Sequence, residues 1–266
     1  MAKMTKKAAT GKARGVQAPS FDSALIVKKL LSEIPDRARE VLTLRFGLGT
    51  SSERETLEAI GERWSITRER VRQIEAAAIE AVRGSKAFKD AKAPFDELAK
   101  IIDAEGGILP EDHLLDALAS DEKGRNRFRF LLVVGSAFFR ERETEEFFAR
   151  WHVNHTTAKK VHAALSSLYS SLSDEEVLSE SELFSRFLKE LKEVEAAYRD
   201  EEILKRWLSL SKNIGKNPLA EWGKVSAPAI RTKGIRDYAY LVIKRQGAPM
   251  HFRDVADAIT SLFAKK

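Results

Sequence analysis

Apolar residues recur every three to four positions along most of this chain, which is the spacing of amphipathic α-helices. The first apolar stripe lies in residues 21–33. Pro35 then marks the start of a second helix, because the N–H that proline lacks has no partner in a first turn. That helix is predicted to end at Phe46-Gly47, and the polar residues 47–55 are typical of a loop.

Two threonines mark the start of the next two helices. Thr56 is placed to cap a helix over Leu57–Arg63 and Thr67 one over Arg68–Arg83, since a threonine hydroxyl accepts hydrogen bonds from first-turn N–H groups. Gly61 lies inside the shorter helix, where glycine is costly, so we expect it to let the following helix cross closely. The four helices together predict a compact bundle.

The periodic pattern restarts after Pro94. Three further helices are predicted up to Val134, and residues 137–153 hold two aromatic-rich runs around a charged centre, which indicates a β-hairpin. Three helices followed by a hairpin is the order of a winged helix, and the alternative is a generic α+β domain with no DNA role. The later predicted elements are a helical stretch over 156–211, a turn or wing-like connection over 211–228, and helices over 234–245 and 251–263.

Charge is distributed unevenly along the chain. Residues 1–86 carry 17 basic and 11 acidic side chains, residues 87–211 carry 18 and 25, and residues 212–266 carry 11 and 4, which gives balances of +6, −7 and +7. We expect the basic ends to meet nucleic acid and the acidic middle to face solvent or a basic protein surface. The alternative is that all three are merely solvated faces.

Composition excludes several classes of protein. Apolar residues make up 43% of the chain and charged residues 32%, which is typical of a globular protein. No stretch approaches the run of about 20 apolar residues that crosses a bilayer, so we expect no membrane partner. The basic start lacks the apolar core of a secretory signal, and the absence of cysteine fits a reducing cytosol, so we expect a cytoplasmic protein.

The sequence contains no catalytic motif. A P-loop, a GxGxxG run and a GxSxG elbow are all missing, so we expect no enzyme activity, no cofactor and no small-molecule substrate. His152, His155 and His162 are close enough in sequence to raise the question of a metal. Without cysteine, an HExxH motif or a clear carboxylate partner, we predict packing or surface roles for them and no metal site.

The helix predicted from Arg68 divides into an apolar and a polar face. Val71, Ile74 and Ala78 cluster on one side at 100° per residue. On the other side lie residue types that hydrogen-bond to base edges, in the two turns that a helix-turn-helix places in the major groove. A merely solvated face would more often show Glu–Lys pairs. Thr67 is a candidate phosphate donor. The candidate base-contacting residues are Arg68, Glu69, Arg72 and Gln73.

Residues 33–84 resemble region 4 of bacterial primary sigma factors, in the blocks IPDRAREVLTLRFGLG, TLEAIGERW and ITRERVRQIEAAAIEAVR. The resemblance implies binding to the upstream (minus-thirty-five) promoter element, with the four residues above as base readers. It also implies contact with the flap of the RNA polymerase β subunit through apolar surface on the earlier helices. Ala77 departs from the family, which often has lysine there. The positions where the family touches the DNA backbone are Arg37, Arg45, Thr56, Leu57 and Arg83.

A weaker resemblance covers residues 230–259, in the run GIRDYAYLVIKRQGAPMHFRDVADAIT, which is similar to the opening of the HARE-type helix-turn-helix. A first helix, a turn with Pro249, and His251-Phe252 before a second helix carry it. The third helix and wing of that winged-helix family would follow Lys266, so the resemblance is to half a domain. We expect His251 to be structural.

The expected fold is mainly α, a sigma region 4 helix-turn-helix bundle followed by winged-helix-like domains. The expected function is recognition of double-stranded promoter DNA in transcription initiation with core RNA polymerase. We expect no promoter melting by this chain alone, because about 20 low-complexity residues precede the bundle and nothing later resembles the melting region 2. Two alternatives stay open, a repressor or activator independent of polymerase and a polymerase-binding adaptor. The expected domains are a disordered basic tail (1–20), the sigma region 4-like domain (21–86), a winged-helix-like domain (87–155), a helical domain with a wing-like turn (156–225) and the partial HARE-type domain (226–266).

Overall fold

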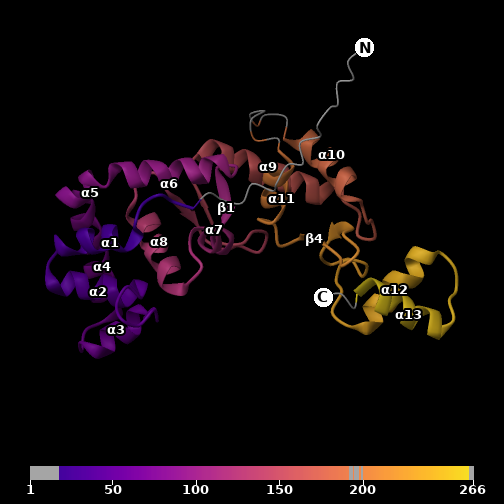
Figure 1. The fold of residues 1–266 in the computed structure, drawn as a ribbon, viewed down its shortest axis with the longest axis horizontal. Helices are drawn as coiled ribbons and strands as arrows, with labels where there is room; N and C mark the ends of the chain where they lie inside the picture. The colour runs from indigo at the N-terminus through magenta and orange to yellow at the C-terminus, as the bar shows by residue number, and fades with distance from the viewer. Residues whose placement is uncertain (1–17, 192–193, 195–197, 199, 264–266) are drawn as a thin grey trace, which may run out of the picture. The chain divides into compact units, whose positions relative to one another are not determined.

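The computed structural model describes residues 18–191, 194, 198 and 200–263 (Figure 1). Over these residues the chain is mainly α-helical, as predicted. The predicted basic tail over residues 1–20 lies almost wholly outside them. No helix in this described part is long and apolar enough to cross a bilayer.

The chain folds as two compact units. Unit 1 comprises Met1–Glu105 and Asp112–Phe139, and unit 2 comprises Gly106–Glu111 and Arg140–Lys266. The short segment Gly106–Glu111 therefore belongs to unit 2, although the residues before and after it in the sequence belong to unit 1.

The first four helices of unit 1 have nearly the predicted bounds. They begin and end where the local chemistry indicates. The hydroxyls of Thr56 and Thr67 accept hydrogen bonds from the N–H groups of Ala59 and Arg70, both at 3.1 Å. Gly47 ends the second helix in the left-handed conformation, with φ of 62°. The four helices are α1 (Ser23–Ser32), α2 (Asp36–Phe46), α3 (Leu57–Arg63) and α4 (Arg68–Gly84).

A later helix completes the bundle. The remaining helices of this region are α5 (Lys86–Asp90), α6 (Lys92–Ala104), α7 (Glu111–Leu118) and α8 (Glu122–Val134). Of these, α8 packs against α1, α2 and α4 (Figure 1). The ring of Phe130 meets that of Phe46 edge-on at 5.4 Å, and Phe128 lies 6.0 Å from Phe21. Unit 1 thus contains the predicted domain over residues 21–86 together with helices that were predicted to belong to the next domain, over residues 87–155.

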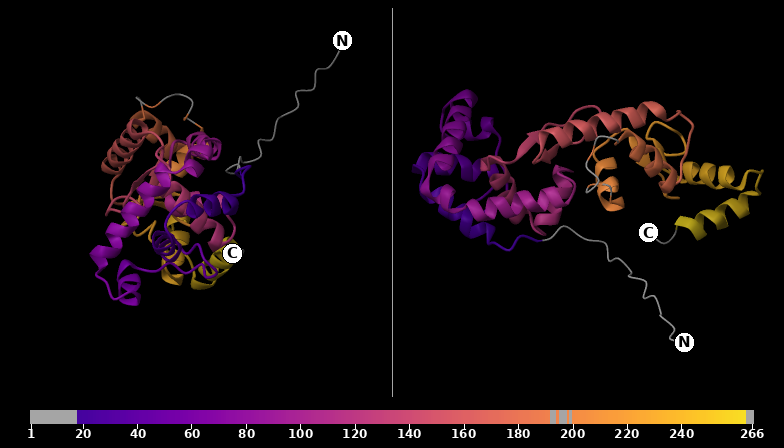
Figure 2. Two further views of the ribbon diagram at one scale, coloured as in Figure 1. Left: turned by 90° about the vertical axis from the view of Figure 1, so that its left-hand side faces the viewer. Right: turned by 90° about the horizontal axis from the view of Figure 1, so that it is seen from above.

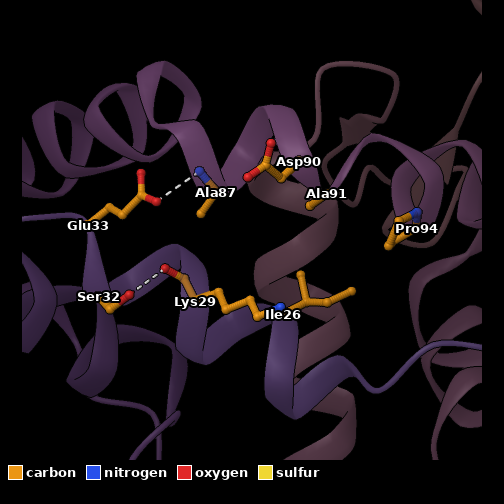
Figure 3. Close-up of a pocket in the computed structure, with 8 residues that line it drawn as sticks. All are labelled: Ile26, Lys29, Ser32, Glu33, Ala87, Asp90, Ala91 and Pro94. Atoms are coloured by element: carbon orange, nitrogen blue, oxygen red, sulfur yellow. Dashed lines mark hydrogen bonds between the residues drawn. The ribbon is translucent and has the colours of Figure 1, made fainter.

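A hollow of about 330 Å³ marks the seam between α1 and α5 (Figure 3). On one side Glu33 accepts a hydrogen bond of 3.0 Å from the backbone N–H of Ala87. On the other side lie Ala91 and Pro94, at the junction of α5 and α6. The Glu33 carboxylate connects the two helices. We therefore interpret this hollow as a gap left where the helices pack and not as a binding site.

A three-stranded sheet has the order β1-β3-β2. Its strands are β1 (Ile108–Pro110), β2 (Phe139–Glu141) and β3 (Arg150–His152). All residues of these strands except Phe139 belong to unit 2. In the antiparallel pair of β1 and β3, Leu109 lies opposite Trp151. The adjacency of β2 and β3 agrees with the hairpin predicted over residues 137–153. The winged-helix assignment stays a prediction.

Three helices build the core of unit 2. They are α9 (His155–Ser171), α10 (Glu180–Glu190) and α11 (Glu201–Leu208). Their apolar faces meet in a cluster that includes the fully buried Phe187 and Trp207. The indole N–H of Trp207 donates to the carbonyl of Gly106 at 3.1 Å, which fastens α11 to the segment that leads into β1. The predicted connection over 211–228 contains a small hairpin of β4 (Ile214–Lys216) and β5 (Trp222–Lys224).

Two helices follow that hairpin, α12 (Ile235–Gln246) and α13 (Phe252–Phe263), close to the bounds predicted for them. Gly247 ends α12 in the left-handed conformation, with φ of 68°. The two helices pack side by side, coloured gold in Figures 1 and 2. Whether they form half of a HARE-type domain stays a prediction.

Candidate nucleic-acid interface

The turn between α3 and α4 is built around Gly61. A Cβ atom placed on Gly61 would lie 2.7 Å from the carbonyl oxygen of Ile66, closer than side chains approach a backbone. The N–H of Ile66 in turn donates to the carbonyl of Gly61 at 2.9 Å. Between them Ser65 takes a positive φ of 53°, which is uncommon for a residue with a side chain. The close crossing expected from the position of Gly61 is therefore present.

Inside the bundle, α4 buries the face that its periodicity predicts. Val71, Ala78 and Val82 are buried, and Ile74 is partly buried. Val71 packs with Val41 of α2 and Ile60 of α3, all three with no exposed surface. This three-helix contact fixes the rotation of α4 about its axis, so its opposite face is held towards solvent.

That opposite face carries the four candidate base-contacting residues. Arg68, Glu69, Arg72 and Gln73 are all exposed and lie in the first two turns of α4. Arg72 donates two hydrogen bonds to the Glu69 carboxylate, from Nε at 2.8 Å and Nη2 at 2.7 Å. Arg68 pairs instead with Glu58 of α3, at 3.0 Å. The structure therefore brings the predicted set together as a continuous polar surface.

These exposed pairs set the charge states of the surface. The hydrogen bond from Arg72 holds the pKa of Glu69 below its usual value, and the same contact raises the pKa of Arg72. Both groups are therefore charged at neutral pH. Because exposed ion pairs in water are weak, each guanidinium can exchange its carboxylate for a base edge at small cost.

The residues predicted to contact the DNA backbone, which are those assigned by resemblance and Thr67, have different surroundings. Arg37 lies over the ring of Trp64, 5.3 Å from its centre. Arg45 donates to the Glu75 carboxylate at 3.3 Å and to the carbonyl of Glu55 at 3.0 Å. Thr56 and Thr67 are helix N-caps, and Leu57 begins α3. All of them lie on α2, at the start of α3 or at the start of α4.

Arg83 differs from these residues, because its side chain forms hydrogen bonds that stabilise the fold. Its Nε and Nη2 donate to the carbonyls of Val134 and Val133, each at 3.0 Å, and its Nη1 to Glu80 at 2.7 Å. Those carbonyls are at the C-terminal end of α8, where backbone acceptors lack helical partners. Arg83 thus ties the end of α4 to the end of α8.

Asn126 of α8 is a second residue at this contact, and the sequence analysis did not identify it. It is fully buried, and its amide nitrogen donates to the carbonyl of Ser52 at 2.7 Å and to that of Gly47 at 3.4 Å. It therefore holds the 47–55 loop that leads into α3. An asparagine on the buried face of an aromatic-rich helix was the available signal, because a buried amide requires hydrogen-bond partners.

Comparison with known proteins places this site within one family module. Residues 30–84 match the model of the family "Sigma-70, region 4". The RNA polymerase sigma factor SigA of Clostridium acetobutylicum is 46% identical over 65 residues, which cover 23% of this chain and 17% of that protein.

Two further sigma factors match the chain over a similar length. RpoS of Coxiella burnetii is 46% identical over 57 residues, covering 21% of this chain and 16% of that protein. RpoD of Helicobacter pylori is 42% identical over 57 residues, covering 21% of this chain and 8% of that protein. The chain therefore spans less than a fifth of the length of these curated relatives. No solved structure matches it.

Proposed function

We propose that α4 binds double-stranded promoter DNA and recognises the upstream (minus-thirty-five) element in transcription initiation. The observation that carries this proposal is the exposed group Arg68, Glu69, Arg72 and Gln73 on the first two turns of the second helix of a helix-turn-helix. The match of residues 30–84 to sigma-70 region 4 supports the same role.

The mechanism follows from the chemistry of the side chains. With the start of α4 in the major groove, an arginine guanidinium donates to guanine O6 and N7, and a glutamine amide pairs with adenine. The Glu69 carboxylate accepts from a cytosine amino group once Arg72 has turned to its own base. The N-terminal N–H groups of α4 and the nearby Thr67 hydroxyl contact a phosphate and fix the register.

Core RNA polymerase is the proposed protein partner, because the relatives that match are polymerase sigma factors. Contact with the β flap would involve α1 and α2, whose inner faces are covered by α8. On α1, Leu25 is 50% exposed and offers an apolar surface outside that contact. We propose that the chain works in the cytoplasm, has no enzymatic activity and does not melt DNA itself. The match at residues 30–84 supports a role in promoter binding alone.

Fluorescence anisotropy with duplexes that vary the hexamer tests the DNA-reading role. Arg72→Ala should weaken binding to the preferred hexamer on the order of tenfold to a hundredfold and relax selectivity at one base pair. Arg142→Ala removes the same charge from an exposed position in unit 2 and serves as the matched control. An unchanged hexamer preference in Arg72→Ala would rule out the assignment.

Two further measurements separate the proposal from its alternatives. A salt titration should show a steep fall of DNA affinity, because phosphate contacts release counterions, whereas an adaptor would show almost none. Co-purification with core polymerase should succeed, and a repressor that acts alone would not be retained.

A further inference from the structure

A cluster of potential metal ligands lies in unit 2, outside the DNA-reading surface. Glu141, His152 and His155 each offer one ligand atom, and the three atoms all lie within 4.8 Å of one another. The sequence indicated no carboxylate partner for these histidines. In the fold Glu141, eleven positions before His152, supplies one.

The fold brings these residues together from three elements. Glu141 ends β2 and His152 ends the neighbouring strand β3, while His155 begins α9 directly after its N-cap, Asn154. Because alternate residues of a strand share a face, His152 lies on the same side of β3 as Arg150. Trp151 takes the opposite side, where its indole N–H donates to Glu111 at 3.0 Å.

The two oxygens of Glu141 have different neighbours. Its Oε2 accepts a hydrogen bond of 2.5 Å from Nη2 of Arg150, a side chain that is 5% exposed. Its Oε1 lies 3.3 Å from Nε2 of His152, which is 1% exposed. Arg150 therefore orients the carboxylate and leaves Oε1 directed at the histidine. Metal-bound carboxylates in proteins are commonly oriented by such a hydrogen bond.

We propose that Glu141, His152 and His155 bind a zinc ion, with Arg150 as the residue that orients the carboxylate. Two imidazoles and one carboxylate form a ligand set suited to zinc, and the fourth position is left for water. Zinc–ligand bonds of about 2.0–2.1 Å place tetrahedral ligands about 3.4 Å apart, so the cluster must contract. The exposed His155 side chain, 5.5 Å from His152 between ring centres, can supply that movement.

A zinc ion at this position would fasten the β2–β3 hairpin to the start of α9. The carboxylate binds through Oε1 alone, because Oε2 is held by Arg150. The guanidinium also repels the metal, so we expect weaker binding than in a site built only of thiolates and imidazoles. Binding of the ion does not depend on the proposed DNA recognition.

Cobalt(II) and zinc titrations of the full, untagged chain test the site, after metal removal on a chelating resin. Visible absorption of bound cobalt should saturate at one ion per chain, and zinc should displace it. Zinc should also raise the midpoint of thermal unfolding, since it binds only the folded state. Absence of saturable binding by either ion would overturn the proposal.

Variants locate the ion on these residues. His155→Ala should lower zinc affinity at least about tenfold, because even residues that only orient a ligand contribute that much. Its side chain is exposed, so the fold should persist, which circular dichroism can verify. His113→Ala, an exposed histidine of unit 1, is the matched control and should bind zinc as the unaltered chain does. Equal affinity in His155→Ala and His113→Ala would also overturn the proposal.

Discussion

Arg72 in unit 1 and Arg150 in unit 2 each hold a glutamate, yet their surroundings differ. The side chain of Arg72 is 58% exposed, and that of Arg150 is 5% exposed. The hydrogen bond to Glu69 raises the pKa of Arg72, whereas burial lowers the pKa of Arg150. An exposed pair can exchange its partner for DNA, but a buried one cannot separate without leaving a charge unpaired. The same pair of residue types therefore serves the proposed recognition of DNA in one unit and the stability of the fold in the other.

Arg150→Ala should have the largest effect on stability. It removes the partner of Glu141 and the donor to Nε2 of His162, in a buried network. We expect a loss of about 3–5 kcal/mol in the free energy of unfolding of unit 2. Urea unfolding followed by tryptophan fluorescence measures it, because Trp151, Trp207 and Trp222 all belong to unit 2.

The matched variant is Arg72→Ala, which removes the same side chain from an exposed pair. Its unfolding curve should overlay that of the unaltered chain. If the two variants destabilise the protein equally, the contrast between an exchangeable and a fixed ion pair is wrong.

Gly61→Ala should have the next largest effect, now in unit 1. The added Cβ would meet the Ile66 carbonyl at 2.7 Å, so α3 and α4 must move apart. We expect a loss of about 1–3 kcal/mol in unfolding free energy, together with weaker DNA binding. The control is Gly84→Ala, which meets nothing within 4 Å and should stabilise the end of α4 by about 0.5–1 kcal/mol. Equal thermal midpoints for the two variants would contradict this account of the turn.

Arg83→Ala should lower stability less than Arg150→Ala and Gly61→Ala do, and it separates two roles for one residue. Because Arg83 ties the end of α4 to the end of α8, the variant should lose about 1 kcal/mol of stability and keep its hexamer preference and salt dependence. If it mainly contacts a phosphate, stability should be kept, and the slope of log affinity against log salt should fall by about 1. Thermal unfolding and a salt titration of the same variant decide between them.

Local signals made the bundle predictable. The caps Thr56 and Thr67 and the apolar spacing of α4 act within a few residues, so they indicate both the helix bounds and the face that reaches solvent. The base-reading candidates followed from that face. Their ion pairs did not follow from it, and Arg68 pairs with Glu58 on another helix.

Contacts between distant residues were not predictable in the same way. Asn126 bonds to a loop more than seventy positions earlier, and nothing in the spacing of apolar residues indicates that pairing. Glu141 reaches His152 only because the hairpin aligns their strands. In both cases the partner is chosen by tertiary packing, which a reading of periodicity does not contain.

The packing of α8 on α1, α2 and α4 determines which part of the chain can be transferred to another protein as the proposed DNA-binding module. A gene fusion that transplants residues 21–86 alone would leave Phe46 without Phe130 and the 47–55 loop without Asn126. A graft that continues to Phe139 would keep both contacts. The smallest transferable piece of this protein is therefore longer than the stretch that resembles its relatives.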